Sequence, residues 1–126
     1  MFKEIKTNDA PAAIGPYSQA VSVGNFLFAS GQIPVDPATG NVPEGIEAQA
    51  EQSCKNVGAI LKANGMDYSN VVKTTCFLAN MGDFAKFNEV YAKYFNGSIK
   101  PARSCVAVKD IPKGVLCEVE ILAVKE

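Results

Sequence analysis

The chain has a single arginine, Arg103, among its twelve basic residues, and it has no histidine. This arginine occurs in a mostly apolar run, residues 102–108, that directly follows a proline. A guanidinium group stays charged at any physiological pH, and its forked donors suit a planar anion such as a carboxylate or a phosphate. We therefore expect Arg103 to bind an anionic partner, which either the chain itself or a ligand supplies.

Two carboxylates, Glu118 and Glu120, occur in a second apolar run, residues 115–124, at a spacing that puts them on one face of a strand. If the two runs pair as neighbouring strands, Arg103 lies opposite Glu120 and diagonal to Glu118 on the same face. One interpretation of this cluster is a structural ion pair at a subunit interface. The other is a functional site, because two carboxylates and one guanidinium leave one glutamate free for proton transfer.

The four cysteines, Cys54, Cys76, Cys105 and Cys117, are widely spaced and form no CxxC pair. Without histidine, a zinc site has few ligands to draw on. Cys105 is interpreted as a small buried apolar residue, because no histidine is present to activate it as a nucleophile. We expect reduced thiols, no metal site and no cofactor.

A length of 126 residues, 48% of them hydrophobic, and a net charge of −1 indicate one soluble globular domain over residues 1–126. The lysines are scattered along the chain, which argues against a nucleic-acid-binding surface. The amino terminus lacks the apolar core of a signal peptide, so we expect a cytoplasmic protein. Residues 10–35 carry no charge, but their prolines and glycines exclude a membrane-spanning helix.

The sequence pattern predicts an antiparallel start to the fold. Two strands flank the turn pair Gly24-Asn25, and a cluster of turn residues at 34–41 indicates a loop. The expected strands cover residues 2–6, 18–23, 26–30, 71–79, 102–108 and 115–124, and the last two are expected to be antiparallel neighbours.

Two amphipathic helices are predicted between these strands, at residues 46–64 and 83–95, and Asp83 is the expected N-cap of the second helix. Two helices can cover only one face of a sheet. The fold class is therefore α+β, with a mixed sheet of about six strands and both helices on one face. The uncovered face would expose apolar side chains, which indicates an oligomer.

The sequence resembles the RidA (YjgF) family of reactive-intermediate deaminases over essentially its whole length. Cys117 is a small departure, at a position where an aliphatic residue is usual. The likeness rests on five segments in the same order along the chain, Ile14-Gly-Pro-Tyr-Ser-Gln-Ala20, Ser30-Gly-Gln-Ile-Pro34, Phe87-Asn-Glu-Val-Tyr91, Pro101-Ala-Arg-Ser-Cys-Val106 and Cys117-Glu-Val-Glu120.

The resemblance implies a chorismate-mutase-like two-layer fold, assembled as a homotrimer with three clefts between subunits. It also implies hydrolysis of 2-imino acids, such as 2-iminobutanoate and 2-iminopropanoate, to 2-keto acids and ammonia. A protonated imine is already electrophilic, so this reaction needs a fixed carboxylate, an aligned water and a proton shuttle rather than a metal or a covalent nucleophile.

By position, the resemblance implies that Arg103 holds the substrate carboxylate and that Glu118 positions and deprotonates the attacking water. Cys105 would contribute mainly backbone contacts. The residues expected to line the cleft from the neighbouring subunit are Tyr17, Ser30, Gly31 and Asn88.

Three other functions stay open on the sequence alone. A trimeric module that binds small keto acids as a sensor would use the same Arg103 and differ in whether Glu118 delivers water. An endoribonuclease, proposed for relatives of the family, ranks lower because the chain has neither clustered basic residues nor histidine. A chaperone-like role through exposed lysines has no particular residue to support it.

Overall fold

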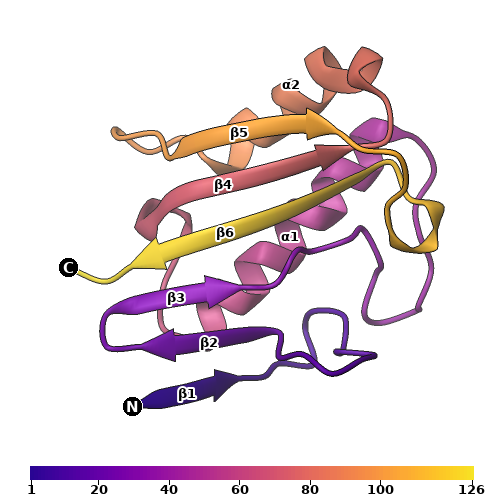
Figure 1. The fold of residues 1–126 in the computed structure, drawn as a ribbon. Coiled ribbons are helices and arrows are strands. Elements are labelled where there is room, and N and C mark those ends of the chain that lie inside the picture. Colours follow the sequence, from indigo (N-terminus) through magenta and orange to yellow (C-terminus); the bar gives the residue numbers. More distant parts are fainter.

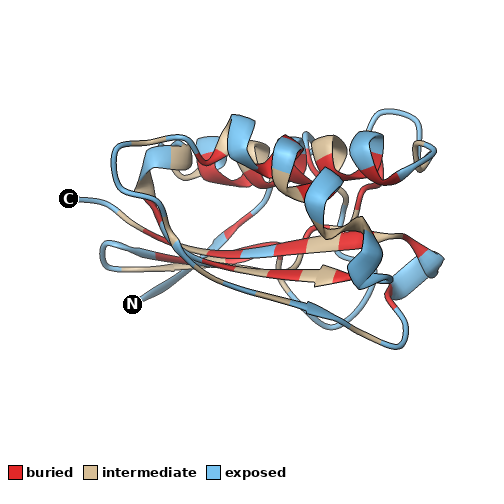
Figure 2. Cartoon of the chain, turned by 90° about the horizontal axis from the view of Figure 1, so that it is seen from above, coloured by how far each residue is buried: buried red, intermediate tan, exposed pale blue.

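The computed structural model describes residues 1–126. Six strands form one mixed sheet in the order β1-β2-β3-β6-β4-β5 (Figure 1). Both helices lie on the same face of this sheet, as predicted (Figure 2). The elements, in chain order, are β1 (Phe2–Ile5), β2 (Ala20–Val23), β3 (Phe26–Ala29), α1 (Ile46–Ala63), β4 (Val71–Leu78), α2 (Phe84–Tyr94), β5 (Ala102–Ala107) and β6 (Cys117–Val124).

Helix α1 forms the centre of the helical layer and contacts both β6 and α2. It ends at Asn64-Gly65, as expected: Gly65 adopts a left-handed φ of 68°, and its N–H donates to the carbonyl of Lys62. The apolar positions that predicted this helix are all buried, namely Ile46, Ala50, Cys54, Val57 and Leu61.

Helix α2 begins after a short 3₁₀ turn, Met81–Asp83, and buries Phe87, Val90 and Tyr91. Asp83 occupies the N-cap position, but its side chain makes no capping hydrogen bond, so the expected role of Asp83 is wrong. Asn80 caps the preceding turn instead, where its Oδ1 accepts from the N–H of Gly82 at 2.8 Å. The 3₁₀ turn thus moves the side-chain cap three residues toward the amino terminus.

Strands β5 and β6 are not neighbours, contrary to the prediction. Strand β4 lies between them, parallel to β5 and antiparallel to β6. Helix α2 connects β4 to β5, and a strand–helix–strand crossover of this kind pairs its two strands in parallel. The segment 108–116 then passes over the end of β4, where Val108 N–H donates to the Leu78 carbonyl and Ala79 N–H donates to the Leu116 carbonyl.

The core lies between the sheet and the two helices, where 22 buried residues form one apolar cluster. The opposite face of the sheet, here called the open face, has no helix over it (Figure 2). Phe26 and Phe28 of β3 remain 46% and 48% exposed there, whereas Leu27 between them is fully buried in the core. Neither helix combines the length and the apolar character that a bilayer span would require.

Candidate functional site

Arg103 lies on edge strand β5 and points to the helical side of the sheet, where helix α2 holds its guanidinium group. The Nη1 atom donates to Asn88 Oδ1 at 2.7 Å. The guanidinium carbon lies 4.8 Å from the ring centre of Tyr91 and 5.4 Å from that of Phe84, within the range of cation–π attraction. One amide and two aromatic rings therefore fix the orientation of this charge.

A buried hydrogen bond fixes the Tyr91 ring in turn. Its hydroxyl lies 2.8 Å from Oγ1 of Thr74, which is the register partner of Arg103 on β4. Both side chains are buried, and burial raises the pKa of the Tyr91 hydroxyl. This hydrogen bond therefore links strand β4 to helix α2 next to the guanidinium group.

The bond to Asn88 is the only hydrogen bond that the Arg103 side chain makes within the chain. The remaining guanidinium donors have no carboxylate of the chain to bind. Arg103 also lines a pocket of about 310 Å³, together with Lys100, Pro101 and residues of the second half of α2. A held guanidinium with free donors is suited to bidentate binding of a carboxylate.

Glu118 lies on β6 with its carboxylate against Gly31. A Cβ atom on residue 31 would lie only 2.8 Å from Cδ and 3.0 Å from Cγ of Glu118, so only the hydrogen of a glycine fits there. The pKa of Glu118 is raised, first by burial and second by the negative charge of Glu120. A half-buried carboxylate with a raised pKa is suited to accept and return a proton.

Tyr17 and Ser30 lie close to Gly31 along the chain. The Ser30 hydroxyl donates to the carbonyl of Ser18 at 2.6 Å, which links the end of β3 to the segment before β2. Tyr17 is 51% exposed in the loop before β2, and its hydroxyl accepts a weak hydrogen bond from the N–H of Ile14 at 3.4 Å. An exposed tyrosine in this position is available to a ligand or a second subunit.

The structure separates the seven expected site residues into two groups. Arg103, Asn88 and Cys105 belong to the helical side of β5 and its neighbour α2. Glu118 pairs with Phe77 on the open face, whereas Arg103 pairs with the buried Thr74 on the helical side. The second group therefore contains Glu118, Gly31, Ser30 and Tyr17.

This grouping corrects two expectations. Arg103 and Glu118 were expected on one face of a hairpin, but the intervening strand β4 places their side chains on opposite faces of the sheet. Asn88 was expected to approach from the neighbouring subunit together with Tyr17, but it is bonded to Arg103 of its own chain. The first error follows from pairing β5 with β6 directly.

Cys105 is half-buried and packs against the core beside its register partner Cys76. Burial raises its pKa, and the nearby Arg103 charge only partly opposes this effect. All four cysteines are free thiols. No group of three or more potential metal-ligating side chains is found in the structure.

Sequence reasoning missed Thr74, Phe84 and Tyr91, which position Arg103. Phe84 and Tyr91 fall within the predicted second helix, but no role beside Arg103 was assigned to them. A usable signal exists, because Phe84, Asn88 and Tyr91 occur at positions i, i+4 and i+7 and so share one face of the helix. An amide between two aromatics on that face could have marked a site for a cation.

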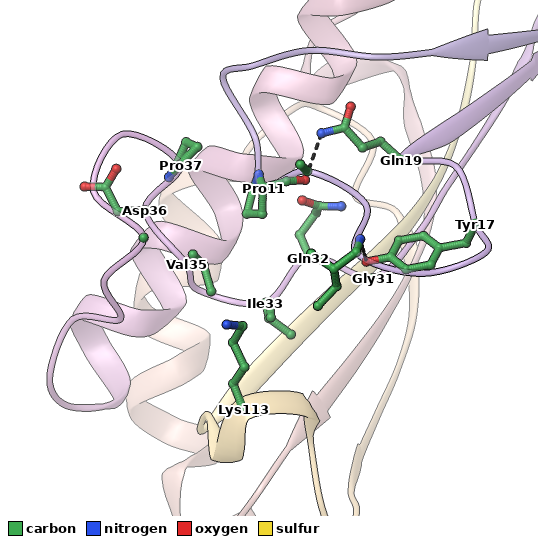
Figure 3. A pocket seen from close by; sticks show the side chains of 13 residues that line it. Pro11, Tyr17, Gln19, Gly31, Gln32, Ile33, Val35, Asp36, Pro37 and Lys113 are labelled. Carbon is green, nitrogen blue, oxygen red and sulfur yellow. Dashed lines mark hydrogen bonds between the residues drawn. The ribbon is translucent and has the colours of Figure 1, made fainter.

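A further pocket, of about 240 Å³, lies beside the second group (Figure 3). Tyr17 and Gly31 belong to its lining, together with Gln32, Lys113 and several apolar residues. Sequence reasoning did not single out Gln32 or Lys113. No local pattern links them, because 80 intervening residues separate them along the chain.

The fold and these two groups define a class of protein: a small α+β domain with an arginine held on one face of its sheet and a half-buried carboxylate on the other. Residues 7–125 match the family model described as Endoribonuclease L-PSP. The chain therefore belongs to this family, which is the RidA/YjgF family.

Two relatives illustrate the names that the family carries. A RutC family protein of Pyrococcus horikoshii is 53% identical over the full length of both chains. The 2-iminobutanoate/2-iminopropanoate deaminase of Mus musculus is 52% identical over 98% of this chain and 91% of its own.

Solved structures of relatives have the same fold. The YjgF gene product of Escherichia coli has a TM-score of 0.95 at 49% identity, over 98% of this chain and 99% of its own. TdcF of Escherichia coli, solved with bound serine, has a TM-score of 0.95 at 45% identity over the same shares.

Proposed function

We propose that this protein hydrolyses 2-imino acids to 2-keto acids and ammonia, with 2-iminobutanoate and 2-iminopropanoate as substrates. The observation that carries the proposal is the set of contacts around Arg103. Its guanidinium is held by Asn88, Tyr91 and Phe84, yet no carboxylate of the chain binds it. A ligand carboxylate supplies the missing anion, and every 2-imino acid has one next to the reacting carbon.

Glu118 performs the proton transfer in this proposal. Its carboxylate takes a proton from water as the water oxygen attacks the carbon of the protonated C=N bond. The resulting carbinolamine has one C–O and one C–N bond at that carbon. Glu118 returns the proton to the nitrogen, the C–N bond breaks, and ammonia leaves. Glu118 takes the hydroxyl proton as the C=O bond forms, and this proton leaves with ammonia as ammonium. The raised pKa of Glu118 suits a group that must both accept and return a proton.

The site is proposed to be shared between subunits of a homotrimer with a chorismate-mutase-like arrangement. Arg103 and Glu118 lie on opposite faces of one sheet, so a second copy is required to bring both groups to one substrate. The open face supports association, because Phe26 and Phe28 expose nearly half of their surface there. The number of three subunits follows from the family resemblance.

The relatives support the choice of reaction. The mouse relative, and an Escherichia coli relative that is 50% identical over 99% of both chains, are named 2-iminobutanoate/2-iminopropanoate deaminase. The TdcF structure contains serine, an amino acid with the carboxylate and the size that the proposed substrates share. The endoribonuclease description of the family has no counterpart here in a cluster of basic residues.

A competition assay tests this function. An amino-acid oxidase generates each imine in place, a nucleophilic amine traps it, and keto acid formation is measured for the wild type and for Arg103→Ala. We expect the wild type to outrun the trap and Arg103→Ala to fail. If the wild type also fails while keto acids still bind to it, the protein is a ligand sensor rather than a deaminase.

A further inference from the structure

The pocket in Figure 3 lies between the loop before β2 and the segment that follows β3. Its volume is about 240 Å³, enough for an amino-acid side chain. Much of its wall is apolar, with Pro11, Ile14, Ile33 and Val35 among the lining residues. Several polar side chains interrupt this wall, among them the amide of Gln32 and the ammonium group of Lys113.

Gln32 is only 5% exposed. Of the two polar atoms of its side-chain amide, only the nitrogen makes a hydrogen bond within the chain. Its Nε2 donates to the carbonyl of Ser30 at 3.1 Å, which fixes which end of the amide is the nitrogen. The Oε1 atom accepts no hydrogen bond from the chain. The oxygen is open to the pocket, since no buried side-chain oxygen or nitrogen of the chain is without a partner. A ligand that covers this oxygen without bringing a donor leaves it unpaired, so the oxygen favours a ligand that has a donor.

Lys113 lies on the opposite wall and extends its side chain toward Ile33 and Val35 (Figure 3). It is the only non-glycine residue with a left-handed φ, 63°, in the turn that precedes β6. Asp36 also lines the pocket, but its Oδ1 accepts from the N–H of Ala38 at 2.9 Å in a local turn. The ammonium group of Lys113 gives its wall a hydrogen-bond donor that suits an acceptor of the ligand, while the carboxylate of Asp36 balances its charge.

Two residues connect this pocket to the candidate catalytic group. Tyr17 and Gly31 line it, and Gly31 lies against the carboxylate of Glu118. A substrate whose reacting carbon is next to Glu118 is thus adjacent to the pocket, at the position where its side chain must be accommodated.

We propose that this pocket is the side-chain subsite of the enzyme and that it selects an uncharged polar end, a carboxamide above all, over an apolar chain of the same shape. A carboxamide has N–H donors for Gln32 Oε1 and an oxygen for Lys113, whereas an apolar chain leaves both groups without a partner. The inference rests on the proposed function, because it identifies the ligand side chain as that of a 2-imino acid.

Equilibrium binding tests the inference independently of turnover. L-Asparagine and L-leucine have nearly the same shape, do not react, and differ in the carboxamide. The wild type is expected to bind asparagine about tenfold more tightly than leucine, because bound leucine covers Gln32 Oε1 without giving it a hydrogen bond. In Gln32→Met, which keeps the side-chain length but removes Oε1, this ratio falls to about one.

Lys113→Met provides a second variant that keeps the fold, because Lys113 is exposed. It is expected to weaken asparagine binding about threefold and to leave leucine binding unchanged. Lys62→Met, an exposed change on α1, is the matched control and should leave both dissociation constants as they are. Equal binding of both amino acids by the wild type, or a ratio that Lys113→Met does not reduce, overturns the proposal.

The side chains of asparagine and leucine also distinguish a failure of this inference from a failure of the proposed function. Imines generated from asparagine and leucine are compared with 2-iminobutanoate in the trap assay, and the ratio of their kcat/KM values should follow the binding ratio. If no imine is hydrolysed while the binding ratio holds, the proposed function fails and the pocket assignment stands. If 2-iminobutanoate is hydrolysed without any preference between the two larger imines, the subsite proposal fails and the function stands.

Discussion

Arg103 and Glu118 lie on opposite faces of the same sheet. Arg103 pairs with Thr74, which is buried under α2, and Glu118 pairs with Phe77, whose side chain faces the other way. A residue on one face of a strand cannot reach across the sheet to a ligand on the other face. One chain thus contains the carboxylate-binding group and the proton-transfer group of the proposed reaction in two separate places.

The identity of the cation at position 103 is expected to matter more than its charge. Arg103→Lys keeps the positive charge but loses the planar fork and the stacking on Tyr91 and Phe84. We expect kcat/KM to fall by about 100-fold or more while the melting temperature stays within about 2 °C of the wild type. Lys86→Arg, on the exposed side of α2, is the control. Near-normal turnover of Arg103→Lys would remove Arg103 from its proposed role.

The bond between Thr74 and Tyr91 is expected to act on substrate binding through Arg103. Tyr91→Phe and Thr74→Val each break the same 2.8 Å contact while keeping the shape of the side chain. Each should raise KM about three- to tenfold with a smaller effect on kcat, and the double variant should be no worse than either single one. Steady-state kinetics on the three variants would show an unchanged KM if the contact only stabilised the fold.

Gly31 is expected to be required for the position of the Glu118 carboxylate. Gly31→Ala places a methyl group where Glu118 now lies, without backbone strain, because the φ of Gly31 is not left-handed. We expect a loss of about 100-fold in kcat and a folded protein. Gly97→Ala, whose nearest neighbour would be 3.7 Å away, is the matched control. Full activity of Gly31→Ala would show that the position of Glu118 is not critical.

Glu118 is expected to limit activity at low pH. The base must be ionised, so the rate falls as the pH drops through the raised pKa of Glu118. Because the charge of Glu120 contributes to that raised pKa, Glu120→Gln should lower it and shift the acidic limb of the pH–rate profile to lower pH. A profile that Glu120→Gln does not move, or moves to higher pH, would contradict this assignment.

The same carboxylate is expected to reduce stability at neutral pH. Since folding raises the pKa of Glu118, its favourable contribution is present at low pH and is lost as the pH rises through the folded-state pKa. Glu118→Gln, uncharged at every pH, should therefore melt about 2 °C above the wild type at neutral pH and show no gain at acidic pH. Its kcat should fall about 10²- to 10⁴-fold. A lower melting temperature at neutral pH would show that the ionised group stabilises the fold.

Most of the fold could be predicted from the sequence, because local patterns determine it. The spacing of buried residues from Ile46 to Leu61 identified α1, and Gly24-Asn25 identified the β2–β3 hairpin. The ends of the predicted helices and strands lie within two residues of the observed ones. Strand order was the exception. A short connection from β5 to β6 suggested direct pairing, and no local pattern shows that β4 fits between them.

The candidate site was predictable by residue type but not by arrangement. A lone arginine on an apolar strand and a glutamate on another marked Arg103 and Glu118 from their chemistry alone. Their distribution over two faces depends on β4, and the contact between Glu118 and Gly31 joins residues 87 positions apart. Long-range contacts of this kind follow from the sheet order, which the sequence pattern left undetermined.

The most direct test of the shared site is complementation between two inactive variants. Arg103→Ala and Glu118→Ala are each expected to be inactive alone, but unfolded together and refolded in equal amounts they form mixed assemblies. A site between subunits is intact when one neighbour supplies Arg103 and the other supplies Glu118, which random mixing gives in about one quarter of the sites. We predict recovery of about one quarter of the wild-type activity, and no recovery above the separate variants would contradict the account.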